Sequence, residues 1–511
     1  MTLKHNSLSR RRWLQSAAAG TIAAAVGSTE NRSFAADESP EVVAIGSRRE
    51  LFVDDELIES LDDIDLVLHR PRDEGQVLAF DEPWEGGFCA YATVIRDGDR
   101  LRLYYRGLGV AGQDGNRSET TCYAESTDGV DWTKPDLGLF EVKGTRQNNV
   151  VLSDAAPVTH NFSPMLDTRP GVPQEQRYKA LGGTVKSGLV AWVSADGTRW
   201  RRLQDAPVIP SDQVPFPHFF DSQNLAFWST AEQQYVCFFR VFQDKIRRIA
   251  RCVSEDFVHW SPPVVMDYRH RGGQAPIEHL YTNQTHPYFR APHLYVSIAA
   301  RFMPRRQVLT DDQARAINVN PRYFKDTSDA ILMTARPGRE YYDRTFLSSF
   351  VRPGIGARNW VSRTNYPALN VVQTGPTEMS VYLNQDYAQP TAHLRRYSMR
   401  LDGFASAQAD YHGGELVTKP LTFTGSQLAI NFATSAAGGI RVEMQDENGQ
   451  PIPGYTLDES REQIGNEIDR IVSWRSGPDV SPLAGRPVRL RFAMKDADLF
   501  AMQFSDTATT G

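Results

Sequence analysis

Cysteine is scarce in this chain. Its 511 residues include four cysteines, Cys89, Cys122, Cys237 and Cys252, and no two of them form a Cys-x-x-Cys pair. That spacing excludes a structural zinc site and a disulfide framework. Cys237 and Cys252 fall in consecutive expected strands, where a cross-strand disulfide would be geometrically allowed. Because cysteine is among the most buried residue types, we instead expect four buried thiols.

An excess of positive charge is absent as well. Lys and Arg number 56 against 62 Asp and Glu, which gives a formal net charge of −6. Five of the basic side chains lie in the first 35 residues beside a single acidic one, so the remainder is more acidic than the whole. A nucleic-acid-binding surface needs a clustered basic stripe, and the composition therefore excludes nucleic acid as a partner.

Long apolar runs are also missing, and no stretch is long enough to span a bilayer as a helix. The N-terminus instead resembles an export signal. Residues 9–15 read Ser-Arg-Arg-Arg-Trp-Leu-Gln, which is the register of a twin-arginine motif; residues 17–26 are weakly apolar, and residues 33–35 offer small side chains for cleavage. We expect residues 1–35 to be a signal peptide read by the twin-arginine export machinery, and the mature protein to be periplasmic or secreted without a membrane span.

A repeated turn is the most informative feature that is present. Residues 126–132, 194–200 and 254–260 all read Ser-x-Asp-x-x-x-Trp, with starts 68 and 60 positions apart, and fainter echoes follow at residues 334–338 and 400–404. One such segment is simply a good hairpin turn, because Asp bonds its own backbone and Gly tolerates positive φ. Five spaced copies indicate an array of similar units. The sequence therefore predicts a five-bladed β-propeller.

The strands between the turns follow the same plan. Residues 91–95 and 101–106 alternate with period two around the hairpin signal Arg96-Asp97-Gly98. We expect an all-β protein whose propeller spans residues 45–408, with residues 50–53 closing the ring against the last blade. The fourth blade carries a long insertion at about residues 303–325. Beyond residue 411 the alternating strands lack the repeated turn, which predicts an appended β-sandwich over residues 412–508.

Three acids are expected at one mouth of the propeller channel. Asp221, Glu278 and Glu378 each open what we expect to be the innermost strand of a blade, the third, fourth and fifth. Carboxylates that converge repel one another, so at least one pKa should rise toward the range of a general acid. A carboxylic acid paired with a carboxylate is the equipment of glycosidic bond cleavage. Solvated loop acids are the alternative for any one of them.

Arginines and other polar groups are predicted beside these acids. Arg106, Arg240 and Arg301 each end the second strand of a blade, and antiparallel pairing returns that strand to the same mouth. Arginine there can bind a carboxylate, a sulfate or a pair of sugar hydroxyls, or can hold the catalytic acids in place. The further residues expected to bind substrate are Asn224, Asn283, Tyr281 and His218.

The combination of five blades, Ser-x-Asp turns, inner-strand acids and a C-terminal β-sandwich resembles glycoside hydrolase family 32 and its arabinan- and xylan-active propeller relatives. The block Asp221-Ser222-Gln223-Asn224 resembles the family's second-acid motif, and Glu278 resembles its general acid. The resemblance would place a further acid in the second blade, yet that blade opens with His160-Asn161 and has no acid before Asp167. The family's N-terminal Trp-Met-Asn-Asp-Pro-Asn-like block is also missing. Either the acids are shifted by one blade, with Glu378 completing the set, or the activity has diverged from that of the family.

Three functions follow from these residues. The first is an exported glycoside hydrolase acting on a plant or algal glycan, with Glu278 as general acid, Asp221 as nucleophile or base and Glu378 as pKa modulator or substrate ligand. The second is a sialidase-like hydrolase with Tyr281 as nucleophile beside Glu278. The third is a non-catalytic carbohydrate-binding propeller. No cofactor is expected; a calcium ion in the channel remains open, although no metal-ligand spacing is recognisable.

Overall fold

The computed structural model describes residues 42–110 and 114–506, and nearly all of their regular structure is β-strand. The predicted export signal, residues 1–35, lies outside these described residues. Within them, α1 (Asp311–Ala316) is the only α-helix, and no helix combines the length and apolarity that a bilayer crossing requires. Short 3-10 turns occupy Val158–His160, Gln174–Gln176, Ser211–Gln213, Ala357–Trp360 and Ser481–Leu483.

Five antiparallel sheets form the blades of a propeller, as the repeat predicts. Blade I contains β6 (Ala90–Asp97), β7 (Arg100–Gly107), β8 (Thr120–Ser126) and β9 (Val150–Leu152). Blade II contains β10 (Ser163–Leu166), β11 (Tyr178–Gly182), β12 (Val190–Ser194) and β13 (Arg201–Arg202). Blade III contains β14 (Leu225–Ser229), β15 (Gln234–Gln243), β16 (Ile246–Ser254) and β17 (Val264–Val265).

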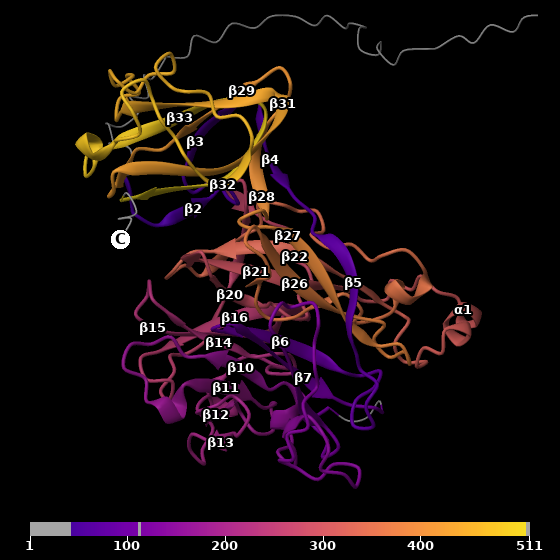
Figure 1. Cartoon of the computed structure of the whole chain (residues 1–511). Coiled ribbons are helices and arrows are strands. Elements are labelled where there is room, and N and C mark those ends of the chain that lie inside the picture. Colours follow the sequence, from indigo (N-terminus) through magenta and orange to yellow (C-terminus); the bar gives the residue numbers. More distant parts are fainter. Residues whose placement is uncertain (1–41, 111–113, 507–511) are drawn as a thin grey trace, which may run out of the picture. The chain divides into compact units, whose positions relative to one another are not determined.

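The last two blades are larger. Blade IV runs from β20 (Thr285–Tyr288) through β21 (Ala291–Met303), β22 (Thr327–Ala335) and β23 (Tyr341–Asp343) to β18 (Asp267–His270) and β19 (Gly273–Gln274). Blade V has β24 (Tyr366–Pro367) and β25 (Val372–Gln373) as its inner segments, followed by β26 (Glu378–Gln385), β27 (His393–Arg400) and β5 (Arg72–Ala79). In Figure 1 the indigo strand β5 accordingly lies beside the orange strands of the chain's later part.

The repeated turn ends the third strand of each of the first three blades. In the first copy the Ser126 hydroxyl accepts from the Gly129 amide at 2.8 Å, and one Asp128 oxygen accepts from the amides of residues 130 and 131. The Trp132 indole donates to the Gly129 carbonyl at 3.2 Å. The copies at residues 194–200 and 254–260 repeat these bonds. The echoes at residues 334–338 and 400–404 begin near the ends of β22 and β27, the third strands of the last two blades.

The same turns join neighbouring blades. The Gly129 carbonyl accepts from the Tyr382 hydroxyl of blade V at 2.7 Å, and the Gly197 carbonyl accepts from the Tyr104 hydroxyl of blade I at 2.8 Å. Both glycines have positive φ, and a Cβ would lie 2.5 Å and 2.7 Å from the respective hydroxyls. Glycine is therefore required there by both backbone conformation and space.

Ring closure differs from the prediction. We expected residues 50–53 to close the last blade, but β2 (Arg49–Leu51) pairs with β33 (Val488–Ser505) outside the propeller. The outer strand of blade V is instead β5, which pairs with β27. The strands of the propeller thus span residues 72–400, a later start than the expected residue 45.

The remaining strands form one ten-stranded sheet that we call the terminal β-domain. It combines both ends of the described chain: β1 (Val43–Gly46), β2, β3 (Ile58–Asp62), β4 (Ile64–Leu68), β28 (Ala405–Ala409), β29 (Gly414–Thr418), β30 (Leu421–Phe423), β31 (Gln427–Asp446), β32 (Asn466–Ile471) and β33. The long strands β31 and β33 pair with each other along nearly their whole length, with a break in register between Thr434 and Gly439 that divides each strand into two halves. Side chains from both halves share one core, as the stacked rings of Phe423 and Phe504 illustrate. An extra β domain is confirmed, but it recruits N-terminal strands as well.

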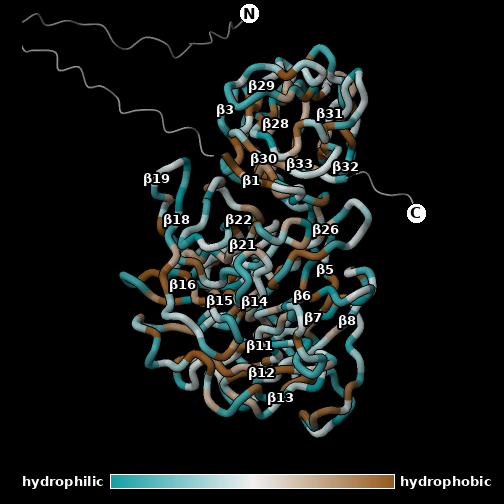
Figure 2. The backbone as a smooth tube through the Cα atoms, turned by 90° about the vertical axis from the view of Figure 1, so that its left-hand side faces the viewer, coloured by the Kyte–Doolittle hydropathy of each residue, from teal (hydrophilic) through white to brown (hydrophobic). Residues whose placement is uncertain are grey.

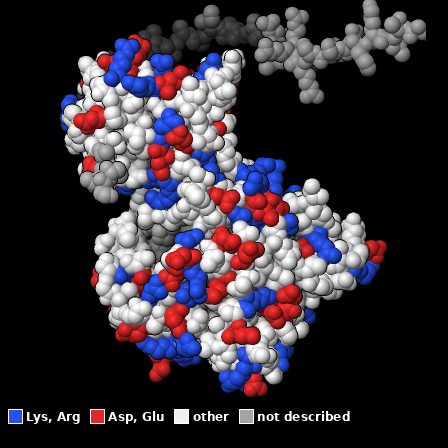
Figure 3. Space-filling model, viewed as in Figure 1, with Lys and Arg blue, Asp and Glu red and all other residues white. Residues whose placement is uncertain are grey.

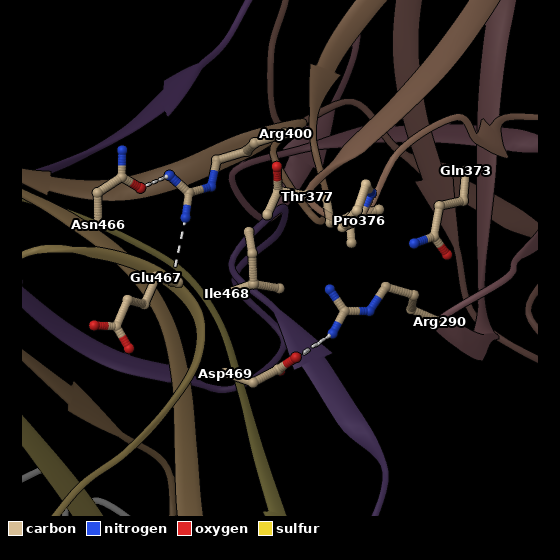
Figure 4. Close-up of a pocket in the computed structure, with 10 residues that line it drawn as sticks. Arg290, Gln373, Pro376, Thr377, Arg400, Asn466, Glu467, Ile468 and Asp469 are labelled. Carbon is tan, nitrogen blue, oxygen red and sulfur yellow. Dashed lines mark hydrogen bonds and ion pairs between the residues drawn. The ribbon is translucent and has the colours of Figure 1, made fainter. Parts of the chain in front are cut away.

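A buried carboxylate ties this domain to the propeller. Asp402 is fully buried and accepts from Arg49 at 3.2 Å, Arg290 at 3.1 Å and the Tyr288 hydroxyl at 2.8 Å. Asp469 of the terminal β-domain accepts from the same two arginines at the surface. Figure 4 shows Arg290 bonded to Asp469. Both residues line a pocket of about 690 Å³.

The propeller channel is divided into a polar and an apolar part. Gln223 of blade III donates to the Thr93 hydroxyl of blade I at 2.7 Å, and Gln284 of blade IV donates to Gln223 at 2.8 Å and to the Pro367 carbonyl of blade V at 2.7 Å. Further along the inner strands lies an apolar space of about 450 Å³, whose lining includes Val94, Met165, Trp228, Tyr288 and Val371. In Figure 2 the β18–β19 hairpin is coloured as hydrophilic, whereas brown, hydrophobic segments alternate with other residues along the strands.

The state of the cysteines and the distribution of surface charge agree with the expectations from the sequence. All four cysteines are free and buried, as predicted. This includes Cys237 and Cys252, which are opposite each other on the neighbouring strands β15 and β16 without forming a disulfide. On the face drawn in Figure 3, acidic and basic side chains are interspersed over the propeller without a continuous basic stripe.

Candidate active site

One residue from each blade meets at the polar mouth. Tyr91, His160, Asp221, Tyr281 and Arg363 lie at or just before the inner strands of blades I to V. The rings of Tyr91 and His160 are 5.7 Å apart, and His160 Nε2 lies 3.8 Å from Asp221 Oδ1. On the other side Arg363 Nε donates to the Tyr281 hydroxyl at 3.2 Å. Five equivalent positions of the repeat therefore supply the site.

Asp221 is held in its ionised form. Arg240 donates to its Oδ2 at 2.6 Å, while 44 % of the Asp221 side chain remains exposed. Burial opposes ionisation, but the adjacent His160 and the charge of Arg240 outweigh it and hold the pKa of Asp221 well below its usual range. The carboxylate thus combines a full negative charge with access from solvent.

His160 lies between two carboxylates. Its Nδ1 is 3.1 Å from Glu119 Oε1, and both residues are almost completely buried. Burial alone would lower the pKa of His160, but Asp221 and Glu119 raise it above the usual value for histidine. Arg106, also buried, lies 3.2 Å from the same Nδ1 and covers the Tyr91 ring. The expected placement of Arg106 and Arg240 at the mouth is thus what the structure shows.

Tyr281 is surrounded by positive charge. The guanidinium groups of Arg240, Arg247 and Arg363 lie 4.6, 5.1 and 5.3 Å from the centre of its ring. Burial raises the pKa of this phenol, and the charge of Asp221 raises it as well. The charges of Arg363 and Arg240 outweigh both effects, so the pKa of Tyr281 lies below its usual value. The phenolate form of Tyr281 is therefore stabilised relative to an ordinary tyrosine.

A second carboxyl group, that of Asp326, is affected by the charges of Arg363 and Arg247, but its pKa is shifted in the direction opposite to that of Asp221. Asp326 directly precedes β22, at the end where Thr327 pairs with Met303. Burial raises its pKa, and the neighbouring Ser362 and the charges of Arg363 and Arg247 offset this only in part. Its Oδ1 is buried without a hydrogen-bond partner among the described residues. Asp326 therefore holds its proton to higher pH than an ordinary aspartate.

The blade IV insertion forms one side of the mouth. Tyr323, near the end of this insertion, packs its ring 5.3 Å from Phe88 and 5.6 Å from Tyr387. Arg363 lies over the Tyr323 ring at 4.9 Å. Helix α1, in the same insertion, begins at a Thr310–Gln313 capping box and buries Ala314 in a small separate core.

Asn161 positions the loop that carries Asp221. Its Nδ2 donates to the carbonyls of Phe220 at 2.7 Å and Ser222 at 2.8 Å, the two neighbours of Asp221, and to Gly183 at 2.9 Å. Its Oδ1 accepts from the Gly183 amide at 2.9 Å. One buried side chain thus fixes both flanks of the carboxylate.

We expect Asn161→Ala to free this loop, because the Gly183 carbonyl and the Gly183 amide lose their side-chain partner, while the Phe220 and Ser222 carbonyls keep only Asn224. Each buried group left unpaired costs about 1–3 kcal/mol, so the free energy of unfolding should fall by at least about 2 kcal/mol, measured by chemical denaturation. Asn320→Ala, which changes an amide in the insertion, is the control and should cost less. Equal losses in the two variants would contradict the positioning role.

Three ligand-type atoms at the mouth are close enough to share a cation. One oxygen each of Asp114 and Asp221 and a nitrogen of His160 lie within 4.8 Å of one another. Carboxylate oxygen and imidazole nitrogen suit several divalent metals. The expectation of no cofactor, with calcium left open, therefore stays a prediction.

Two of the predicted catalytic acids lie elsewhere. Glu378 begins β26, the second strand of blade V, because the inner segments are β24 and β25; Tyr366 pairs with Asn384, whereas Val372 pairs with Ser380. Glu378 therefore lies at the opposite end of the blade, bonded to Arg396. The prediction that it opens an inner strand is wrong.

Glu278 is engaged in an ion-pair network rather than in the cluster around Asp221. It accepts from Arg301 at 3.1 Å and from Arg344 at 2.7 Å, and Arg301 also binds Asp329. Among the described residues, no hydrogen bond or ion pair joins Glu278 or Arg301 to Asp221 or Tyr281. Their expected catalytic and substrate-binding roles stay predictions without support from these contacts.

The other predicted substrate ligands have local partners. Asn224 donates to the Ser222 carbonyl at 3.0 Å, and Asn283 accepts from the Thr285 amide at 3.0 Å, so both stabilise their own turns. His218 is exposed and packs 5.4 Å from the ring of Phe242.

Several site residues were not predicted. His160 does stand at the blade position where the resemblance requires an acid, so its place in the repeat was a usable signal. Glu119, Arg247, Asp326 and Arg363 come from loops and strand ends without any motif, and only the folded chain brings them to the mouth.

Comparison with known proteins concerns architecture. No family model and no curated protein matches this chain. It is similar to an N-acetylgalactosamine deacetylase from F. plautii solved with blood group B trisaccharide (13 % identity, TM-score 0.43, 66 % of this chain and 96 % of that one). It is also similar to a Coprinopsis cinerea GH62 α-L-arabinofuranosidase catalytic domain (12 %, 0.39, 65 % and 97 %) and a Bombyx mori GH32 β-fructofuranosidase (11 %, 0.38, 85 % and 95 %). Propeller glycoside hydrolases are thus among its structural neighbours, while the reaction is argued from the site.

Proposed function

We propose that the protein is a glycoside hydrolase that works at the polar mouth of its propeller. The observation that carries this proposal is the pair of carboxyl groups in opposite surroundings: Asp221 contacts a guanidinium group, whereas the half-buried Asp326 has one buried oxygen, Oδ1, without a hydrogen-bond partner among the described residues. Two such groups whose environments separate their proton affinities are the usual basis for assigning a base and an acid.

In this mechanism Asp326 gives its proton to the glycosidic oxygen as the bond to the anomeric carbon breaks. Asp221 either attacks that carbon or removes a proton from the attacking water, and its partner Arg240 keeps it ionised. His160 and Glu119 support Asp221 from behind without touching the sugar. The half-buried Tyr323 offers an aromatic side chain against which a sugar ring can pack.

The physiological setting is part of the proposal. Export to the periplasm or beyond rests on the twin-arginine-like residues 9–15, and it would place the enzyme where plant or algal glycans are met.

The test compares Asp326→Asn with the unchanged protein on a glycan panel and on aryl glycosides with good leaving groups. We expect the rate on glycans to fall by about 10²–10⁴-fold, and the rate on aryl glycosides to fall far less, because a good leaving group needs no proton. Since burial raises the pKa of Asp326, the rate on glycans should decline only above the ordinary range of an aspartate, and this decline should be absent in the variant.

Asp312→Asn, on the exposed surface of α1, removes a carboxylate from the same insertion and should leave both rates unchanged. Equal losses on the two substrate types would argue against a general acid at position 326. Binding without turnover by the unchanged protein would instead indicate a carbohydrate-binding propeller.

A second candidate is a hydrolase with a tyrosine nucleophile, favoured by the lowered pKa of Tyr281. Its expected partner Glu278 makes no described contact with this phenol. Tyr281→Phe distinguishes the candidates, because loss of turnover with retained binding would support the tyrosine over Asp221.

A further inference from the structure

Two arginines at the mouth have no carboxylate partner. Among the described residues, neither Arg247 nor Arg363 forms an ion pair, in contrast to Arg240, which is paired with Asp221. Arg363 donates from Nε to the Tyr281 hydroxyl, and Arg247 lies near His279 Nδ1 at 3.4 Å. Burial and the charge of Arg247 lower the pKa of His279, which favours the neutral imidazole, and a neutral ring does not compensate the charge of Arg247.

The rings around these arginines leave their edges available. Arg247 is covered by Phe242, Tyr281 and Phe302 at 4.8–5.1 Å from the ring centres, and Arg363 by Tyr281 and Tyr323. Cation–π contacts occupy the faces of a guanidinium group, whereas its hydrogen bonds lie in its plane. The buried Nε of Arg247 indeed has no hydrogen-bond partner, and neither do Nε and Nη1 of Arg240.

Concentrated positive charge is energetically costly in this setting. Burial and the charge of Arg240 lower the pKa of Arg247. Uncompensated buried charges and unpaired buried donors both destabilise a fold. Such an arrangement is explained when an anionic group of a ligand completes it, since guanidinium groups bind carboxylate and sulfate through paired in-plane hydrogen bonds.

We propose that the substrate is an anionic sugar whose carboxylate or sulfate group is bound by Arg247 and Arg363. That the bound sugar is a substrate rests on the proposed function, whereas its binding by the two arginines does not depend on catalysis. The anionic group would lie beside Tyr281 and Asp326, so it would orient the adjoining glycosidic bond toward the acid.

The experiment measures binding by calorimetry with galacturonate, galactose 6-sulfate and galactose. The unchanged protein should bind at least one anionic sugar about tenfold or more tightly than galactose, and Arg363→Gln should abolish that preference. Arg247→Gln should act in the same direction, which protects the result should one variant fold poorly. Arg201→Gln removes the same charge from the exposed strand β13 and should change nothing.

Preference for galacturonate identifies a carboxylate, and preference for galactose 6-sulfate identifies a sulfate. Equal affinity for all three sugars, or a preference that survives both arginine variants, would overturn the inference. Hydrolysis separates it from the proposed function. Turnover of neutral glycans with no preference for anionic sugars would support the hydrolase and refute the anionic substrate. Arginine-dependent binding of anionic sugars without turnover of any glycan would support the anionic ligand and refute the hydrolase.

Discussion

Asp221→Asn should lower kcat/KM on a hydrolysed glycan by roughly a thousandfold or more while the protein stays folded. The substitution keeps the shape of the side chain but removes the charge that Arg240 and His160 stabilise. A neutral amide can neither attack an anomeric carbon nor accept a proton from water, whichever of the two roles Asp221 has. Because 44 % of this side chain is exposed, the fold should tolerate the change.

The measurement is a steady-state assay on the best glycan of the panel, with melting temperatures recorded for each variant. Asp212→Asn, an exposed aspartate in the preceding turn, is the matched control and should keep full activity. KM should change much less than kcat if Asp221 acts on the reacting atoms. A variant that keeps a tenth or more of the activity would remove Asp221 from the mechanism.

Asp402→Ala should produce the largest loss of stability among single substitutions at the surface between propeller and terminal β-domain. It deletes a fully buried carboxylate and leaves the guanidinium groups of Arg49 and Arg290 without that partner. Removing one member of a buried ion pair costs about 3–5 kcal/mol, because the remaining charge stays desolvated. The Tyr288 hydroxyl loses its acceptor as well.

Asp469→Ala is an informative control, since Asp469 pairs with the same two arginines but is half exposed. Exposed pairs contribute about 0–1 kcal/mol, so this variant should be nearly neutral. Both are compared by chemical denaturation followed through tryptophan fluorescence. Similar losses for the two variants would show that burial at Asp402 is not what stabilises this contact.

The blade architecture was predictable because its signal is local. A Ser-x-Asp turn closes its hydrogen bonds within seven residues, so Ser126, Asp128 and Trp132 specify the same structure wherever they occur together. Strand alternation located Arg106 and Arg240 at the mouth for the same reason. Asp221 was found because it lies just before the inner strand of the third blade, in the segment between the second and third copies of this turn.

The errors arose where pairing is long-range. Which of several short segments is innermost in blade V depends on contacts with other blades, and those contacts select β24 and β25 over the stronger strand pattern at Glu378. Ring closure was misassigned because two N-terminal segments can each supply an edge strand. Only the folded chain shows that β5 pairs with β27 and β2 with β33.

The amino-acid sequence by itself thus determined the repeat, the five blades, the free cysteines and the position of Asp221 at the mouth. The tertiary structure decided the rest of the chemistry. It brought His160, Asp326 and Arg363 to the mouth from three different blades, and it placed Glu278 and Glu378 in other ion pairs. The reason is physical: a turn is specified by bonds between neighbours in the chain, whereas charge, burial and pKa depend on groups that only the closed ring brings together.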